Sequence, residues 1–195
     1  LVMSTTHSIK PFPENIDRNY FGAWLSGFTD GEGCFRLLCE KGRDFVVPAA
    51  NFSIAIRHDD SEVLYLAQSF FGCGLLYLNK KYYGKIFGNP TSTFRINKTR
   101  DLTKVLIPHF ENFPLLAKKK NDFLIWREGV LMLYKVLTRR LRFSKHKQRS
   151  CCRWTDNELL HFQSLMKALK NQRAYKAQPI PLPEIRKSAF ETKPL

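Results

Sequence analysis

The feature that most constrains the fold is the run Leu25–Phe35, which reads Leu-Ser-Gly-Phe-Thr-Asp-Gly-Glu-Gly-Cys-Phe. With the residue two positions before it, the run places Ala23, Gly27 and Gly31 at i, i+4 and i+8, along one ridge of an α-helix. Glycine in a helix interior costs about 1 kcal/mol relative to alanine, so two glycines on one ridge require a compensating interaction. Close approach of a second helix provides it. The pattern therefore predicts a helix–helix interface along this ridge.

The same segment predicts an amphipathic helix from about Asn19 to Asp30, with two acidic residues at its end. Its apolar residues have the i, i+3, i+4, i+7 spacing of one stripe: Phe21, Trp24, Leu25 and Phe28. Asp30 and Glu32 follow where the ridge of small residues ends. A carboxylate at a buried junction between helices needs a cation to compensate its charge, and Mg²⁺ prefers oxygen ligands of this kind. The two acids therefore predict a metal site at the helix–helix interface.

The run resembles the signature of the LAGLIDADG homing endonucleases, with common variants of it at Ser26, Phe28, Thr29, Gly31 and Glu32. Several later segments are similar to the family in their order and character: 52–57, 64–74, 94–97 and 101–119. Residues 105–115 look especially like the connection between two helices of the family. The resemblance covers roughly residues 19–137.

Periodicity along the chain predicts an α+β protein with an antiparallel sheet and helices on one side of it. We expect strands at Cys34–Cys39, Ala50–His58, Leu75–Asn79 and Thr91–Asn97. After the first helix, we expect a second that starts at Asp59–Ser61 and stops at Gly72, a third that starts at Thr99 or Asp101 and ends before Pro108, and a fourth over Leu115–Leu137. The resemblance implies the αββαββα homing-endonuclease fold with a saddle-shaped sheet, here with an extra C-terminal helix.

The chain divides into five expected segments. They are an N-terminal arm (1–18), the core domain (19–137), a basic segment (138–154), a C-terminal helix (155–176) and an extended tail (177–195). Thr155 and Glu158 have the spacing of a capping box, which predicts the start of the C-terminal helix.

The resemblance also implies roles for residues at the end of the first helix. Glu32 matches the metal-ligating acid of the family, and the carbonyl of Gly31 is implied as a further oxygen ligand. For Asp30 we favour a hydrogen-bonding role at the helix end over that of a second catalytic acid. Ala117 stands where some relatives have a lysine, so a basic catalytic role would pass to Lys118 or Lys119. The alternative for these lysines is a solvated helix start.

The implied cofactor is Mg²⁺, with two or three ions per dimer. Mn²⁺ would substitute for it, and Ca²⁺ would bind without supporting cleavage. Two divalent cations can stabilise the charge on the attacking and leaving oxygens of a phosphodiester.

The charge of the chain indicates a polyanionic partner. Lysine and arginine total 32 against 17 acidic residues, for a formal net charge of +15, which favours nucleic acid. One face of the expected sheet is rich in Arg, Asn and Ser, with Glu40 as its one acid near a strand end. Arginine and asparagine hydrogen-bond guanine and adenine edges in the major groove, although an ordinary solvated face remains the alternative. The residues predicted to contact DNA from this region are Arg36, Asn51, Ser53, Arg57, Tyr77, Asn79, Lys81, Arg95 and Asn97.

A second basic region runs from Arg139 to Arg153 and contains no acid. Such a block is typical of a segment that binds phosphates without a regular register. The residues predicted to make these contacts are Arg139, Arg140, Lys145 and Lys147.

The signature occurs once, so two chains must supply a complete interface, which predicts a twofold homodimer. The resulting hypothesis is a site-specific endonuclease that cuts both strands of a long near-palindromic DNA. The alternatives are an RNA maturase that assists intron splicing and a non-catalytic DNA-binding regulator on the same fold. Five cysteines without a metal-ligand spacing indicate reduced thiols, hence an intracellular location: an organelle, where the protein would be organelle-encoded, or a bacterial cytoplasm. No apolar run approaches the ~18 residues that cross a bilayer, so we expect no membrane partner.

Overall fold

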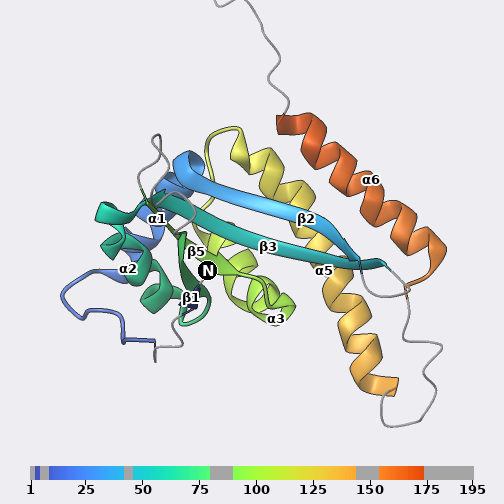
Figure 1. Cartoon of the computed structure of the whole chain (residues 1–195), viewed down its shortest axis with the longest axis horizontal. Helices are drawn as coiled ribbons and strands as arrows, with labels where there is room; N and C mark the ends of the chain where they lie inside the picture. Colours follow the sequence, from blue (N-terminus) through green and yellow to red (C-terminus); the bar gives the residue numbers. More distant parts are fainter. Residues whose placement is uncertain (1–2, 5–8, 42–45, 80–89, 144–153, 174–195) are drawn as a thin grey trace, which may run out of the picture.

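The computed structural model describes residues 3–4, 9–41, 46–79, 90–143 and 154–173. The strands are β1 (Met3–Ser4), β2 (Gly33–Lys41), β3 (Val46–Arg57), β4 (Leu75–Asn79) and β5 (Thr91–Ile96). The helices are α1 (Arg18–Glu32), the short 3-10 helix η1 (His58–Asp60), α2 (Glu62–Phe71), α3 (Thr99–Asp101), the π-helical segment η3 (Leu102–Leu106), α4 (Ile107–Asn112), α5 (Lys119–Phe143) and α6 (Asp156–Arg173). Figure 1 shows this order along the chain.

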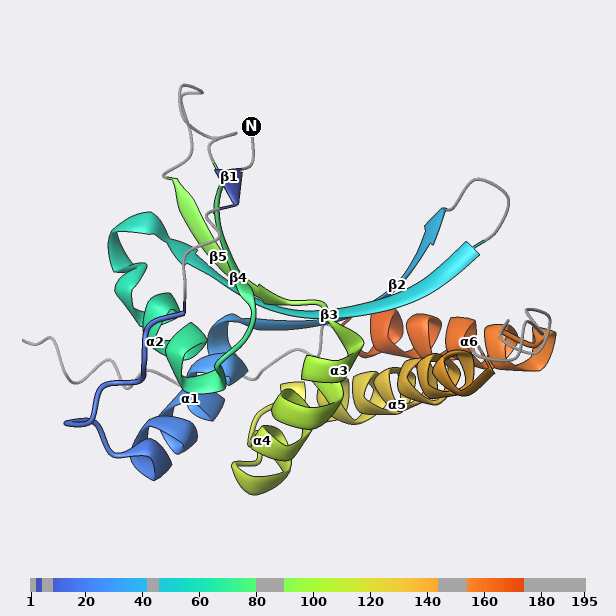
Figure 2. The same cartoon turned by 90° about the horizontal axis from the view of Figure 1, so that it is seen from below.

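The strands form one antiparallel sheet in the order β1-β4-β5-β3-β2. The sheet is curved, and the helices lie on its convex side while the concave side is left open (Figure 2). The predicted α+β architecture, αββαββα with an added C-terminal helix, is therefore confirmed. The two-residue β1, which pairs with β4, is an addition from within the expected N-terminal arm.

The core lies between the sheet and the helices and is rich in aromatic side chains. The alternation in β3 places Phe52 and Ile54 on this side, and both are fully buried. Phe35 of β2 lies at its centre, with its ring 5.1 Å from that of Trp126 in α5. The indole N–H of Trp126 donates to the backbone carbonyl of Asn51 at 3.2 Å, which fixes α5 under β3. Burial of these aromatic rings supplies a large apolar contribution to stability.

The helix that begins at Thr99 continues past Pro108, contrary to the prediction that it ends before this residue. Pro108 lies in the first turn of α4. The π-helical segment η3 ends at Leu106, directly before α4 begins. Proline lacks an N–H, and its ring clashes with the carbonyl four residues earlier in a regular α-helix. The wider turn of a π-helix relieves this conflict, so the chain stays helical to Asn112.

The last two helices also differ from the expectation. Helix α5 begins at Lys119 and continues to Phe143, whereas the sequence predicts Leu115–Leu137. Helix α6 packs along α5 and reaches β2 (Figure 1), with Phe162, Leu165 and Leu169 buried. The predicted capping box is confirmed, because Glu158 N–H donates to Thr155 Oγ1 at 3.2 Å and Thr155 N–H donates to Glu158 Oε2 at 3.0 Å. None of the described helices is long and apolar enough to span a bilayer.

Candidate active site and nucleic-acid interface

Helix α1 carries the signature run and ends at Glu32, so that both acids lie in its last turn. Asp17 caps its start, where the carboxylate accepts from Tyr20 N–H at 2.7 Å. Gly33 caps the end of the helix, and its backbone N–H donates a hydrogen bond to the Thr29 carbonyl. A Cβ at Gly33 would lie 2.4 Å from the Thr29 side chain and 2.7 Å from that carbonyl. Glycine is therefore required where the helix turns directly into β2.

The Asp30 carboxylate connects the end of α1 by hydrogen bonds to the segment that leads into α5. Its Oδ2 accepts from the backbone N–H groups of Leu116 at 2.8 Å and Ala117 at 3.1 Å. This contact agrees with the hydrogen-bonding role that the sequence favours for Asp30. Its other oxygen, Oδ1, is buried and has no hydrogen-bond partner among the described residues.

Of the two candidate lysines, Lys119 reaches the end of α1. Its ammonium Nζ donates to the carbonyls of Asp30 and Gly31, both at 2.9 Å. These carbonyls are at the C-terminal end of the helix, where the dipole attracts cations. Lys118 is exposed, and its side chain makes no polar contact within the described part of the chain.

Glu32 is the last residue of α1, follows Gly31 directly and is exposed. Its carboxylate and the carbonyl of the preceding residue, Gly31, are oxygen donors of the kind that suits a hard cation such as Mg²⁺, which binds one or two carboxylates together with waters and substrate phosphates. Within the described ranges, no group of three or more His, Cys, Asp or Glu residues could hold a metal ion.

The predicted ridge of small residues is open to solvent in the single chain. Ala23, Gly27 and Gly31 are all exposed, and a Cβ added at either glycine would meet nothing within 4 Å. Two aromatic side chains on the same helix are also exposed, Tyr20 at 71% and Trp24 at 39%. The outer surface of α1 is therefore flat and partly apolar.

The predicted apolar stripe of α1 is only half buried by its own chain. Phe21 and Leu25 are in the core, whereas the Trp24 ring stacks on Phe28 at 5.0 Å toward the outer surface. The reason is geometric. At about 100° per residue, Trp24 and Phe28 lie closer around the helix to the ridge of small residues than Phe21 and Leu25 do.

Sequence analysis missed a second ridge of α1, formed by Gly22, Ser26 and Asp30, which binds the connection between α4 and α5. Ser26 Oγ donates to the Phe113 carbonyl at 2.7 Å. A Cβ at Gly22 would lie 2.7 Å from the Phe113 ring, so glycine allows the two segments to approach. The available signal was the recurrence of small or polar residues at i, i+4 and i+8, adjacent to the ridge that was noticed.

His109 of α4 lies beside this second ridge, with Nε2 3.3 Å from Ser26 Oγ. The imidazole is buried among aromatic rings, including those of Phe71 and Phe110. Burial lowers the pKa of His109 to about 4, so the ring is neutral at neutral pH. The ring contributes to the packing between α4 and α1.

The strand register places the predicted polar residues of the strands on one face, the concave one, where the side chain of Ser53 is buried. Arg36 pairs with Asn51 across β2 and β3, and Ser53 pairs with Arg95 across β3 and β5. Arg57, Tyr77 and Asn79 lie on this face too, because residues paired across antiparallel strands point to the same side of the sheet. Arg57 and Asn79 both pair with Thr91, and Tyr77 pairs with Thr93, two residues from Arg95 in β5. Asn97 follows β5 and is exposed. The concave face is called the groove face below.

Side chains on the groove face differ in how they are held. Arg36 is exposed and makes no polar contact with the described residues. The Arg95 guanidinium lies 5.4 Å from the centre of the Tyr77 ring, and its Nε is buried without a described partner. Asn79 Nδ2 donates to Thr91 and Thr93, at 3.2 and 3.1 Å.

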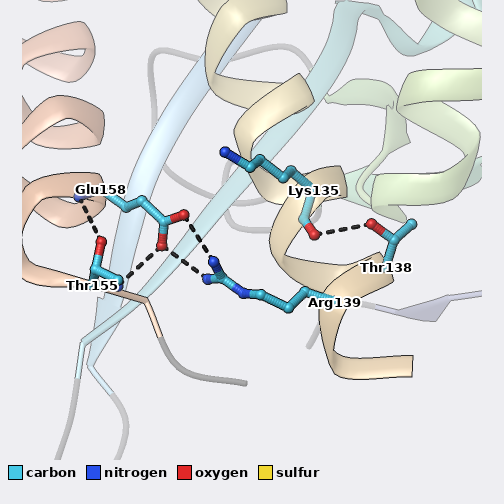
Figure 3. A network of polar contacts seen from close by, with 5 residues as sticks. All are labelled: Lys135, Thr138, Arg139, Thr155 and Glu158. Carbon is cyan, nitrogen blue, oxygen red and sulfur yellow. Dashed lines mark hydrogen bonds and ion pairs between the residues drawn. The ribbon is translucent and has the colours of Figure 1, made fainter. Parts of the chain in front are cut away.

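The second predicted basic region is only partly described. Lys145 and Lys147 lie outside the described residues, as does Lys81, which was predicted to contact DNA from the region of the sheet. The prediction of an irregular segment at Arg139 is wrong, because α5 extends through it, and its guanidinium donates to both carboxylate oxygens of Glu158 at 3.1 and 2.9 Å (Figure 3). Arg140 follows in the same helix.

Residues 25–130 match the LAGLIDADG endonuclease family. Since this match covers more than half of the chain, the protein belongs to that family. It is 29% identical over 114 residues to "Probable intron-encoded endonuclease 2" of Neurospora crassa, which covers 57% of this chain and 24% of that protein. It is 31% identical over 114 residues to "Probable intron-encoded endonuclease Cox1-I1b" of Schizosaccharomyces pombe, over 58% of this chain and 28% of that protein. The chain thus spans about a quarter of the length of these curated relatives.

Solved structures establish the fold independently. The structure titled "I-SmaMI bound to uncleaved DNA target in the presence of Calcium ions" superposes with a TM-score of 0.60 at 23% identity, over 77% of this chain and 45% of that one. "Crystal structure of a homing endonuclease, I-TnaI" superposes with a TM-score of 0.57 at 24% identity, over 80% of this chain and 95% of that one. At these identities the comparison supports the shared fold.

Proposed function

We propose that the protein is a site-specific DNA endonuclease that works as a homodimer and cuts both strands of a near-palindromic target with Mg²⁺. The observation that carries this proposal is the end of α1, where the exposed Glu32 directly follows Gly31, and where the carbonyls of Asp30 and Gly31 bind the Lys119 ammonium. The site lies at the end of an open ridge of small residues. Membership of an endonuclease family supports the same activity.

In this proposal Glu32 and the Gly31 carbonyl hold the cation. Bound there, Mg²⁺ would stabilise negative charge on the oxygens of the scissile phosphate. Lys119 is the basic residue of the site, because its ammonium is held within hydrogen-bond distance of the Gly31 carbonyl. A fixed positive charge at this point can orient a phosphate and stabilise charge that develops during cleavage. Asp30 keeps the Lys119 segment in place through its two backbone hydrogen bonds.

The exposed outer ridge of α1 supports the homodimer. A second copy of Ala23, Gly27 and Gly31 would allow two α1 helices to approach closely, since no side chain bulk separates them. The twofold axis would then bring two copies of Glu32 together, one for each DNA strand. Trp24 would be covered in the same contact, which removes exposed apolar area from water.

The groove face supports the choice of double-stranded DNA as the substrate. A curved two-stranded or larger β-surface fits the major groove, and its outward side chains here include Arg36, Asn51 and Arg95. I-SmaMI, the similar structure described above, is titled as bound to DNA. The names of the relatives further support an origin within an intron, and we propose an organellar location on that basis.

The test of this function compares the wild type with Glu32→Gln on a randomised duplex library. The amide preserves the shape of the side chain but removes its negative charge, so cleavage in Mg²⁺ should fall by roughly a hundredfold or more. Binding in Ca²⁺ should remain sequence-specific. Glu62→Gln, which makes the same change at an exposed position at the start of α2, is the matched control and should cut normally.

Other outcomes identify the alternatives. A wild type that binds one duplex specifically but cuts none in Mg²⁺ would indicate a DNA-binding regulator. Preferential binding to intron RNA over duplex DNA would indicate a maturase. A Glu32→Gln variant that cuts at the wild-type rate would show that the metal assignment is wrong.

A further inference from the structure

An acid lies at the edge of the groove face, where a protein that binds DNA has reason to avoid one. Arg57 is the last residue of β3 and shares the row of Thr91 and Asn79 across the sheet. Asp59 follows in η1, and both of its carboxylate oxygens accept hydrogen bonds from Arg57, one from Nε at 3.1 Å and one from Nη2. A carboxylate near DNA phosphates weakens binding electrostatically. Its position therefore requires a benefit that outweighs this cost.

The bonds to Asp59 leave one edge of the Arg57 guanidinium unused. Arginine has five N–H donors in a rigid planar fork, and Asp59 occupies the Nε hydrogen and one Nη2 hydrogen. The Nη1 amino group and the second Nη2 hydrogen have no other partner among the described residues. Two adjacent N–H groups of this kind match the O6 and N7 acceptors of guanine in the major groove.

The backbone that carries Asp59 is anchored to the sheet through the neighbouring residue. The backbone N–H of His58 donates to the Pro90 carbonyl at 2.9 Å, and its Nδ1 lies 2.8 Å from Ser92 Oγ. Ser61 N–H closes the turn on the His58 carbonyl at 3.1 Å. Because η1 is tied to the start of β5, Asp59 is held at a fixed place relative to Arg57.

We propose that Asp59 is a positioning residue for base recognition, which orients Arg57 to read one guanine in each half of the DNA target. This inference rests on the proposed function, and it adds a specificity determinant to it. The ionised state that it requires is favoured, since the hydrogen bond from Arg57 lowers the pKa of Asp59 below its ordinary value.

The pair is not explained by stability alone. The side chains of Arg57 and Asp59 are 63% and 62% exposed, and exposed ion pairs contribute little to the free energy of folding. The alternative role for Asp59 is a plain surface charge. A plain charge would alter affinity for every duplex alike, whereas a positioning residue alters preference at one base pair.

The test measures base preference and affinity for four full-length proteins: the wild type, Arg57→Ala, Asp59→Ala and Asp60→Ala. Each is incubated in Ca²⁺ with a randomised duplex library, and its affinity for the selected site and for single-mismatch duplexes is then measured at several salt concentrations. Asp60→Ala is the matched control, because it removes an equal charge from the same 3-10 helix but no hydrogen bond to Arg57. All four should melt at similar temperatures, since the substituted side chains are exposed.

We expect Asp59→Ala to lose roughly tenfold in discrimination, at the same symmetric guanine positions as Arg57→Ala. Its affinity for mismatched duplexes should rise or stay the same, because a negative charge is removed. Asp60→Ala should keep the wild-type preference. If Asp59→Ala instead behaves like Asp60→Ala, the positioning role is overturned while the proposed function stands. If the wild type itself shows no sequence preference, the proposed function fails, and this inference fails with it.

Discussion

Two helical surfaces of this protein differ in how far other parts of the same chain cover them. The junction between α5 and α6 is closed: Arg139 pairs with Glu158, and Arg173 donates to Asp122 at 2.8 Å and to the Phe35 carbonyl. Figure 3 shows how the Thr155–Glu158 cap and Arg139 meet at one end of this junction. On the outer ridge of α1, a Cβ added at Gly27 or Gly31 would meet nothing within 4 Å, and the one polar contact with another element among the described residues is the hydrogen bond from Lys119 to the Gly31 carbonyl.

The difference arises from side-chain size and charge. At the α5–α6 junction, bulky apolar residues such as Phe162 and Leu165 exclude water, which strengthens the ion pairs beside them. On the α1 ridge the residues are small, so the backbone of a second helix could approach closely. A closed junction stabilises the single chain, whereas the open ridge is the surface on which we propose that a second copy packs.

The largest expected effect is on the open ridge. Gly27→Leu should abolish both dimer formation and cleavage, because a leucine would separate two α1 helices. The single chain should fold normally, since a Cβ at this position meets nothing within 4 Å. Light scattering without DNA measures the dimer, and thermal unfolding provides the control. A Gly27→Leu protein that stays dimeric would show that this ridge is not the interface.

Gly22, on the adjacent ridge of the same helix, should respond in the opposite way. Gly22→Leu should lower the free energy of unfolding by about 3 kcal/mol, because its side chain would collide with the Phe113 ring. Chemical denaturation measures this change. Gly22→Leu and Gly27→Leu make the same substitution only five positions apart, so equal stability of the two variants would contradict the distinction between a closed and an open ridge.

A smaller effect is expected at the closed α5–α6 junction. Glu158→Gln should lower the free energy of unfolding by roughly 1.5 kcal/mol at pH 7, because a charge-assisted hydrogen bond is lost. The hydrogen bond from Arg139 lowers the pKa of Glu158 from 4.5 to about 2.

The sign of the pH dependence at Glu158 follows from this shift. Since the folded pKa is depressed, the contribution of the carboxylate to stability is complete above pH 4.5 and is lost as the pH falls toward about 2. Denaturation curves of the wild type and Glu158→Gln should therefore converge over this range. A constant difference between them down to pH 2 would contradict the role assigned to the Arg139–Glu158 pair. Cleavage at neutral pH should be unchanged, because this pair lies away from Glu32.

Local patterns predicted the elements that depend on neighbouring residues. The alternation in β3 and the face shared by Arg36 and Asn51 are confirmed. The Thr155–Glu158 capping box is confirmed as well. Periodicity cannot predict whether a helix passes a proline such as Pro108, since this depends on whether the preceding turn widens.

The candidate site was only partly predictable for a related reason. Local pattern could not distinguish Lys118 from Lys119, because the two residues are adjacent where α5 begins. Only the tertiary fold, which brings the start of α5 to the end of α1, places Lys119 Nζ on the Asp30 and Gly31 carbonyls. Likewise, composition alone assigned Arg139 to phosphate binding, whereas the fold brings Glu158 to it.

The sequence by itself determined that α1 has ridges of small residues and that two acids lie at its end, because helical geometry fixes which positions align. Only the tertiary structure decided which ridge is covered. Ser26 bonds a residue 87 positions away and Asp30 one 86 positions away. Adjacent ridges of a helix have the same local periodicity. Long-range contacts therefore decide which ridge is buried and which stays exposed. The connection after α4 covers one ridge and leaves the ridge of Ala23, Gly27 and Gly31 exposed.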